Sequence, residues 1–401
     1  MSNGTHTIPQ DFPPPEPEAA AHSERLAARI KAAIERAGGR IPFDRYMQLA
    51  LYEPGLGYYS AGQPRFGPGG DFITAPLVST LYSRTLARQT AEVLDDLGGG
   101  AVIEFGAGTG RMAADVLAEL IALDRLPAAY YIIEVSAALR QEQQRTLEHI
   151  APEALERVAW LDQLPERPMR GVVLANEVLD ALPVKRFQKA SDCLLEVMVT
   201  RGNDGFEWSA APADDTLRQA ISAIEADVGE PLAAGYTSEW CPGLAPWMRS
   251  LAGILEAGAA LLIDYGYPRR EYYHPQRHMG TMMCHYRHRA HGDPLVLPGL
   301  QDITAYVDFS AAAAAGREAG LELLGFATQA HFLMGAGLPE LIEEAHAGDP
   351  DAAVTLTQEA KTLIFPGEMG ERFKVLGMGR GLSEPLGGFA LFDHRGRLGA
   401  G

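Results

Sequence analysis

Short apolar segments alternate with helical segments through the middle of the chain, which predicts an α/β protein with a doubly wound parallel sheet. The apolar segments are rich in Val and Ile, as are strands that are buried on both faces of a parallel sheet. A glycine-rich turn follows the first of them, and such turns place the backbone close to ligands. With 401 residues, of which 47 % are hydrophobic, the chain is long enough for two or three structural units.

Residues 1–22 are expected to form a disordered tail. Within them, residues 8–18 (IPQDFPPPEPE) are proline-rich and acidic, and they lack the features of a secretory signal or a transit peptide. The three cysteines are far apart and form no C-x-x-C pair, which is typical of a reducing compartment, so we expect a cytoplasmic protein. The apolar stretch 323–339 is too short and too polar to span a bilayer, so no integral membrane segment is expected.

Residues 23–97 are expected to form an N-terminal helical and lid segment. Ser23 would cap a first helix, residues 43–51 would form a second, and residues 78–97 a third. Between the last two, residues 51–76 are rich in glycine, proline and aromatic side chains. A loop of this length inside a compact domain usually acts as a lid or binding segment, and a plain surface loop is the alternative.

Five apolar segments are the predicted strands of the sheet: 101–105, 130–135, 157–161, 171–176 and 259–266. Residues 98–185 would form the first part of the ligand-binding domain and residues 258–390 the remainder, with an irregular substrate loop at 267–309. Residues 186–257 are predicted to be an insertion after the fourth strand. It would contain an antiparallel hairpin around the turn at 202–205 (GNDG).

The turn after the first predicted strand contains Glu104, Gly106, Gly108 and Gly110 in the pattern E-x-G-x-G-x-G. An ordinary strand-to-helix turn can have the same composition. A dinucleotide-binding fold would place its third glycine at position 111, which is Arg111 here, and the G-K-S/T of a phosphate loop is absent. The pattern instead resembles the first motif of the class I S-adenosylmethionine methyltransferases.

Acidic residues end the next two predicted strands. Glu134 lies 24 residues after Gly110, near the position at which a dinucleotide fold binds the ribose. Leu161 and Asp162 end the third strand, where such methyltransferases often present an acid or amide to the adenine. S-adenosylmethionine carries a sulfonium and an ammonium, so carboxylates are expected around it, and we predict it as the cofactor. The alternatives are a solvated strand-end Glu and a loop Asp.

Five separated motifs resemble the MidA-like methyltransferases, a family that includes the mitochondrial complex I assembly factor seven. They are 70–76 (GDFITAP), 174–184 (LANEVLDALPV), Gly280-Thr281 with Tyr286 and His291, 301–309 (QDIT and VDF), and 369–374 (MGERFK). The resemblance covers residues 23 to 380. It departs from the family at residues 81–83 (LYS), where a Phe-Gly pair is common, and at Ala107, where proline is usual.

The resemblance implies a class I, Rossmann-like methyltransferase, whose mitochondrial relative acts on an arginine of a respiratory complex I subunit. It also points to Tyr286 and Asp302 near the methyl acceptor. The lid residues Asp71, Phe72 and Thr74 are expected to close over the cofactor. The alternatives are methylation of a small molecule, and a cofactor-bound assembly factor for complex I in which catalysis is incidental.

Asn176, Glu177 and Asp180 follow the fourth predicted strand and are the expected catalytic residues. A guanidinium is always protonated in water and reacts as a nucleophile only when it is oriented and its charge is localised. The carboxylates of Glu177 and Asp180 could bind it as a fork and accept its proton. The alternative is a helix cap at Asn176 with a first-turn acid at Glu177.

Charge and histidine spacing limit the other classes of function. The net charge of −18 argues against a nucleic-acid-binding surface. Five of the 11 histidines lie within residues 274–291, but their spacing does not fit a zinc module, so no metal is expected. The arginines of the same segment either contact an acidic partner or belong to a solvated loop. The expected partner is a protein substrate, and the oligomeric state, a homodimer included, is left open.

Overall fold

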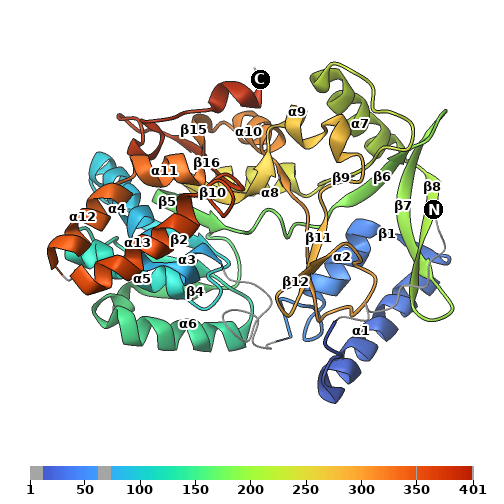
Figure 1. Cartoon of the computed structure of the whole chain (residues 1–401), viewed down its shortest axis with the longest axis horizontal. Coiled ribbons are helices and arrows are strands. Elements are labelled where there is room, and N and C mark those ends of the chain that lie inside the picture. Colours follow the sequence, from blue (N-terminus) through green and yellow to red (C-terminus); the bar gives the residue numbers. More distant parts are fainter. Residues whose placement is uncertain (1–11, 62–73, 349, 400–401) are drawn as a thin grey trace. The chain divides into compact units, whose positions relative to one another are not determined.

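The computed structural model describes residues 12–61, 74–348 and 350–399, and the chain divides into two compact units (Figure 1). Unit 1 consists of Met1–Phe72, Asp180–Leu244 and Tyr267–Tyr306. Unit 2 consists of Ile73–Leu179, Ala245–Gly266 and Val307–Gly401. Each unit is therefore assembled from three separate stretches of the chain.

The central sheet of unit 2 has eight strands in the order β15-β16-β10-β5-β2-β3-β4, with β14 (Val307–Asp308) beside β10. Five strands pair in parallel: β2 (Ala101–Phe105), β3 (Tyr130–Ile133), β4 (Val158–Leu161), β5 (Met169–Asn176) and β10 (Leu255–Tyr267). The last two along the chain, β15 (Glu322–Thr328) and β16 (Phe373–Arg380), are antiparallel. The predicted α/β class with a mostly parallel, Rossmann-like sheet is confirmed.

The helices of unit 2 precede the strands of this sheet or lie between them in the sequence, and they pack around the sheet. They are α3 (Ala75–Val78), α4 (Thr80–Leu97), α5 (Arg111–Ala122), α6 (Ala137–Ile150), α8 (Leu244–Ile254), α10 (Phe309–Glu318), α11 (Gln329–Gly335), α12 (Leu338–Gly348) and α13 (Pro350–Ile364). Helix α4 contacts α5 and β5, and α12 and α13 lie against α4 (Figure 1). The core includes an apolar cluster that contains the fully buried strand residues Val102, Val172 and Leu261. The rigid sheet thus supports the loops at its carboxyl edge.

Unit 1 contains two antiparallel sheets. The larger is formed by β1 (Arg40–Pro42), β6 (Lys185–Lys189), β7 (Leu194–Arg201), β8 (Phe206–Pro212) and β9 (Thr237–Trp240). The smaller is formed by β11 (Met283–Tyr286), β12 (Arg289–His291) and β13 (Asp302–Thr304). The helices are α1 (Pro17–Arg36), α2 (Phe43–Tyr52), α7 (Asp215–Val228) and α9 (Arg269–Tyr272). Strands β7 and β8 form the predicted hairpin, in which Gly202 N donates to Gly205 O at 3.0 Å.

Two predictions for unit 1 are wrong. Helix α1 begins at Pro17, so residues 17–22 are helical and do not belong to a disordered tail. Proline is favoured in the first helical turn, where its missing N–H would have had no partner. The segment 267–309, expected to be irregular, contains the three-stranded sheet. Its strands are only three or four residues long, too short for an alternation of polar and apolar residues to reveal them.

The sequence analysis expects no membrane-spanning segment, and the lengths and apolar character of the helices bear on this expectation. Across residues 12–61, 74–348 and 350–399, none of the helices combines the length and apolar character needed to cross a bilayer. The stretch 323–339, the most apolar in the sequence analysis, is divided among β15, α11 and the start of α12.

Candidate functional site

The glycine-rich turn joins the carboxyl end of β2 to α5 in unit 2. Gly106, Gly108 and Gly110 have φ angles of 63°, 53° and 81°, left-handed values that glycine adopts without strain. A Cβ atom at Gly110 would lie 2.8 Å from the Cα atom of Gln143 on α6. The turn therefore depends on glycine for its backbone conformation, and its last glycine allows α6 to pack closely.

Glu104 lies at the end of β2, directly before this turn, and is buried. Its Oε2 accepts a hydrogen bond from the Tyr130 hydroxyl at 2.5 Å, whereas its Oε1 has no hydrogen-bond partner among the described residues. Burial raises the pKa of Glu104 to about 7, and the hydrogen bond from Tyr130 opposes this rise. A buried carboxylate oxygen with unused acceptor capacity suits a cationic ligand group such as the ammonium or sulfonium of S-adenosylmethionine.

The raised pKa of Glu104 predicts how the stability of the unliganded protein depends on pH. The carboxyl titrates near 4.5 when unperturbed and near 7 in the folded protein, so the folded state holds this proton more tightly. The resulting stabilisation is complete below pH 4.5 and is lost as the pH rises to about 7. Glu104→Gln should remove this contribution. Urea unfolding of both proteins at about pH 5 and about pH 8 measures it, and an unchanged pH dependence in the variant would contradict the assignment.

Glu134 follows β3 and is buried, with a hydrogen bond to each carboxylate oxygen. Its Oε1 accepts from Ser136 N at 2.8 Å, and its Oε2 accepts from Gln143 Nε2 at 3.1 Å. The same amide of Gln143 donates to Gly108 O at 3.0 Å, while its Oε1 accepts from Trp160 Nε1 at 2.8 Å. Gln143 therefore ties Glu134 to the glycine turn. The sequence analysis missed Gln143 because it lies in the middle of a helix and belongs to no motif.

Leu161 and Asp162 lie beside Glu134, at the carboxyl end of β4. Glu134 N donates to Leu161 O at 3.2 Å, and the Asp162 side chain is 82 % exposed and paired with Arg140. Arg140 Nε also donates to the main-chain oxygen of Glu134 at 2.7 Å. Val135, a second residue missed in the sequence analysis, is 74 % exposed and offers an apolar surface next to Glu134. The structure thus brings the three predicted cofactor residues of β3 and β4 together.

We expect Glu134→Ala to weaken the binding of S-adenosylmethionine by roughly 1.5–3 kcal/mol, the scale of hydrogen bonds to charged groups. Calorimetry with the cofactor measures the loss, and a thermal scan reports the accompanying change in stability. Glu196→Ala is a suitable control, since it removes a buried carboxylate of unit 1 that pairs with Lys185 at 2.6 Å. Equal affinity in the wild-type protein and Glu134→Ala would show that this carboxylate does not bind the cofactor.

Glu177 directly follows β5 and has a φ of 53°, which residues other than glycine rarely adopt. Its N donates to Ile263 O at 2.9 Å, and its Oε1 accepts from Asn176 Nδ2 at 3.1 Å. Asn176 Oδ1 in turn accepts from the Tyr82 hydroxyl at 2.5 Å. Residues 177–184 form bends and turns that lead to β6. The alternative of a helix cap at Asn176 is therefore wrong.

Asp180 and Asp302 both belong to unit 1 and are buried. The Tyr59 hydroxyl donates to Asp302 Oδ1 at 2.8 Å. Burial raises the pKa of both Tyr52 and Tyr59, and the charges of Asp302 and Asp180 add to the rise at each phenol. The two acids therefore share one neighbourhood, next to two tyrosines. The chain passes from unit 2 to unit 1 between Leu179 and Asp180, and the fork of Glu177 with Asp180 stays a prediction.

The remaining predicted residues are dispersed over the chain. Tyr286 ends β11 and is buried, with its ring stacked on that of Phe12 at a centroid distance of 6.3 Å. Thr74 precedes α3 as its N-cap residue. Asp71 and Phe72, predicted in the lid, lie outside the described residues. In the part of the chain that the structure describes, no group of three or more His, Cys, Asp or Glu side chains could hold a metal ion.

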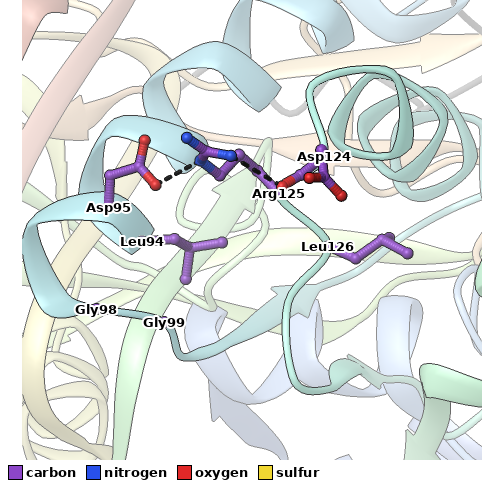
Figure 2. Close-up of a pocket in the computed structure, with 7 residues that line it drawn as sticks. All are labelled: Leu94, Asp95, Gly98, Gly99, Asp124, Arg125 and Leu126. Carbon is purple, nitrogen blue, oxygen red and sulfur yellow. Dashed lines mark hydrogen bonds and ion pairs between the residues drawn. The ribbon is translucent and has the colours of Figure 1, made fainter.

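Figure 2 shows a surface pocket of unit 2 that contains none of these residues. It has a volume of about 310 Å³ and is lined by Leu94, Asp95, Gly98, Gly99, Asp124, Arg125 and Leu126. Arg125 Nε donates to Asp95 Oδ1 at 2.5 Å across it. The lining residues precede β2 and β3, at the amino ends of these strands. Because open α/β sheets bind their ligands at the carboxyl ends, we assign no function to this pocket.

Comparison with known proteins identifies relatives over nearly the whole chain. Residues 85–327 match a family described as "Putative S-adenosyl-L-methionine-dependent methyltransferase". The mitochondrial protein arginine methyltransferase NDUFAF7 of Mus musculus is 30 % identical over 372 residues, which cover 84 % of this chain and 80 % of the relative. The Danio rerio protein of that name is 29 % identical over 391 residues, covering 88 % and 85 %.

A crystal structure of a Burkholderia thailandensis protein bound to S-adenosyl-homocysteine is 45 % identical to this chain. Its TM-score is 0.91, and the match covers 96 % of this chain and 99 % of that chain. A native structure of a protein from the same organism is also 45 % identical, with a TM-score of 0.88. S-adenosyl-homocysteine is the product that remains when S-adenosylmethionine has given up its methyl group. These findings confirm the predicted fold class, the family resemblance and the choice of cofactor.

Proposed function

Because this chain belongs to the family of S-adenosyl-L-methionine-dependent methyltransferases, we propose that its methyl acceptor is an arginine of a protein, such as a subunit of respiratory complex I or a bacterial counterpart. The family model matches residues 85–327, and the similar structure with bound S-adenosyl-homocysteine covers 96 % of this chain. The choice of arginine rests on the names of the NDUFAF7 relatives and on the acids of unit 1.

The cofactor supplies an electrophilic methyl group bonded to a positively charged sulfur. We assign its binding to the carboxyl edge of the sheet in unit 2, where Gly106, Gly108 and Gly110 allow close approach of the backbone. The observation that supports this assignment is the buried Glu104, whose Oε1 has no hydrogen-bond partner among the described residues. Glu134, with Leu161 and Asp162 beside it, would bind the adenosine portion.

The grouping of two buried carboxylates in unit 1 carries the proposal of arginine. The Tyr59 hydroxyl donates to Asp302 Oδ1 at 2.8 Å, and Ala305 N donates to Asp180 O at 3.0 Å, so two buried acidic residues lie in one region of unit 1. A guanidinium suits such a place, because it is always cationic and offers five N–H donors. Carboxylates around it would orient one nitrogen for attack. Glu177, which follows β5 in unit 2, is proposed separately as a general base.

Transfer of a labelled methyl group into a cell lysate tests this function. The wild-type protein is incubated with tritiated S-adenosylmethionine and lysate, and the label is measured in the protein and small-molecule fractions. We expect label in a small number of protein bands, and no such label from Gly108→Val. Label confined to small molecules would favour a small-molecule methyltransferase. Binding of the cofactor with label in neither fraction would favour an assembly factor in which catalysis is incidental.

The cellular location is a separate proposal. Cys193, Cys241 and Cys284 are free thiols, which suits the reducing cytoplasm that we propose. The curated relatives are named as mitochondrial proteins. Fractionation of the producing cells, followed by detection of the protein, decides between the two compartments.

A further inference from the structure

We propose that Tyr82 and Asn176 form a hydrogen-bonded relay that positions the carboxylate of Glu177, so that Tyr82 is a positioning residue for the methyl transfer. All three residues belong to unit 2. Tyr82 lies in the first turn of α4, Asn176 ends β5, and Glu177 begins the turn that follows. The catalytic part of this inference rests on the proposed function of Glu177, whereas the hydrogen bonds of the relay do not depend on it.

The backbone at Glu177 is held in an unusual conformation by its neighbours. Its φ of 53° is disfavoured for a residue with a side chain, and the hydrogen bond from its N to Ile263 O anchors it to β10. The next anchor is Leu179 N, which donates to Asp264 Oδ2 at 2.8 Å. Strained residues persist only where the surrounding structure determines them, and they cluster at functional sites. The main-chain hydrogen bonds thus fix the position of the Glu177 Cα atom, from which the side chain extends.

The direction of each hydrogen bond in the relay follows from the chemistry of its three groups. An ionised carboxylate can only accept, so Asn176 must present its amide nitrogen to Glu177 Oε1, at 3.1 Å. The amide oxygen then faces Tyr82, whose hydroxyl must donate, at 2.5 Å. A reversed amide would place an oxygen against the carboxylate. The carboxylate therefore fixes the orientation of the Asn176 amide, and the hydroxyl of Tyr82 holds the amide in that orientation by donating to its oxygen.

The surroundings of Tyr82 keep its proton in place. Tyr82 is 1 % exposed and Asn176 is 9 % exposed, so water has little access to the relay. Burial raises the pKa of Tyr82 well above its usual value of 10, and the charges of Glu177, Asp264 and Glu104 add to this rise. The phenol is therefore a permanent donor near neutral pH and cannot itself act as the base. Its role is to orient Asn176.

The composition of the chain allows the relay to be observed directly. The sequence contains three asparagines, Asn3, Asn176 and Asn203, and Asn203 is exposed in the β7–β8 turn. In protein labelled with ¹⁵N only at asparagine, we expect the side-chain amide of Asn176 to exchange slowly with water. Tyr82→Phe should speed this exchange at least about tenfold, because the bond from its hydroxyl is lost. Tyr46→Phe is the matched control, since it removes a buried hydroxyl that donates to Pro294 O at 2.8 Å in unit 1.

The same variants test the catalytic consequence with tritiated S-adenosylmethionine and the lysate protein that accepts label from the wild type. We expect Tyr82→Phe to lower kcat about three- to tenfold, the effect of one hydrogen bond, with KM and the affinity for the cofactor nearly unchanged. Tyr46→Phe should leave kcat unchanged. A role in stability alone would lower the melting temperature of both variants without this selective loss of kcat.

Two results would overturn the proposal. The first is an unchanged exchange rate of the Asn176 amide in Tyr82→Phe, which would show that the hydroxyl does not hold the amide. The second is faster exchange together with an unchanged kcat, which would show that the relay does not serve the reaction. If the wild-type protein labels no protein, the proposed function fails and the catalytic role with it. The exchange measurement then still shows whether the hydrogen bond from Tyr82 to Asn176 exists, independently of the proposed function.

Discussion

Replacing Gly108 by Val is expected to abolish the binding of S-adenosylmethionine. Gly108 lies between the two other glycines of the turn, with a φ of 53°, and its main-chain oxygen accepts from Gln143 at 3.0 Å. A branched side chain at this position would occupy the space that we assign to the ligand. It would also strain the backbone, at a cost of order 1–3 kcal/mol. Calorimetry should show at least a hundredfold weaker binding, the largest effect that we expect from any single substitution.

A substitution at a second glycine, Gly98, distinguishes the effect of filling the ligand space from the effect of backbone strain. Gly98 also has a left-handed backbone, with a φ of 70°, and a Cβ atom there would meet no atom within 4 Å. Gly98→Val should therefore lower the melting temperature, as Gly108→Val does, while it leaves the affinity for the cofactor intact. Unchanged affinity in a folded Gly108→Val protein would refute the placement of the cofactor at this turn.

Glu177→Gln is expected to reduce turnover about 10²-fold or more, the usual scale for the loss of a general base. Gln has the same shape as Glu, and its oxygen can still accept from Asn176 Nδ2. It has no negative charge, however, and it places an amide donor where the proton of a cationic acceptor must leave. The affinity for S-adenosylmethionine should change little, because we propose that Glu177 acts on the methyl acceptor and not on the cofactor. Steady-state rates at saturating cofactor, with calorimetry beside them, measure both quantities.

Glu119→Gln provides the control for loss of a buried carboxylate in unit 2. Glu119 lies on α5 and pairs with Arg84 at 2.6 Å and with Arg88 at 3.2 Å, and we expect its substitution to affect stability but not turnover. If Glu177→Gln instead loses cofactor binding and keeps its turnover at saturation, Glu177 belongs to the cofactor site. Full activity in both Glu177→Gln and Asp180→Asn would leave the proposed mechanism without its acid.

The parallel sheet was predictable because each of its central strands is a continuous apolar run. The predicted segment 101–105 coincides with β2, and 171–176 lies within β5. Strands that are buried on both faces need no alternation of polar and apolar side chains. Once such strands are predicted, the glycines and acids that follow them can be read directly from the sequence. Glu104 and Glu134 could therefore be proposed as cofactor-binding residues from the sequence alone, and this role stays a prediction.

Contacts between distant parts of the chain could not be predicted in this way. The small sheet of unit 1 pairs Met283 with Thr304, and each of its strands alone is too short to show a pattern. Tyr82 and Asn176 are separated by 94 residues, and only the packing of α4 beside β5 brings them together. Such contacts depend on tertiary packing, which the spacing of residues within one segment does not record.

The proposed acceptor residues show the same limit. Asp180 was grouped with Glu177 because the two are close in sequence, whereas its charge acts on the same tyrosines as that of Asp302. The order of residues along one turn could not reveal this, since Asp302 reaches its place through a strand of the small sheet. The acid that follows a strand is thus predictable from the local pattern, whereas only the family resemblance pointed to Asp302.

Mass spectrometry of proteins labelled with a deuterated methyl group tests the central claim most directly. The wild-type protein and Glu177→Gln are each incubated with lysate and S-adenosylmethionine that carries the heavy methyl, and the labelled peptides are sequenced. We predict heavy methyl groups on the side-chain nitrogens of arginine in at least one protein, with little or none from Glu177→Gln. Heavy methyl groups only on other residue types, or only in small molecules, would contradict the assignment as a protein arginine methyltransferase.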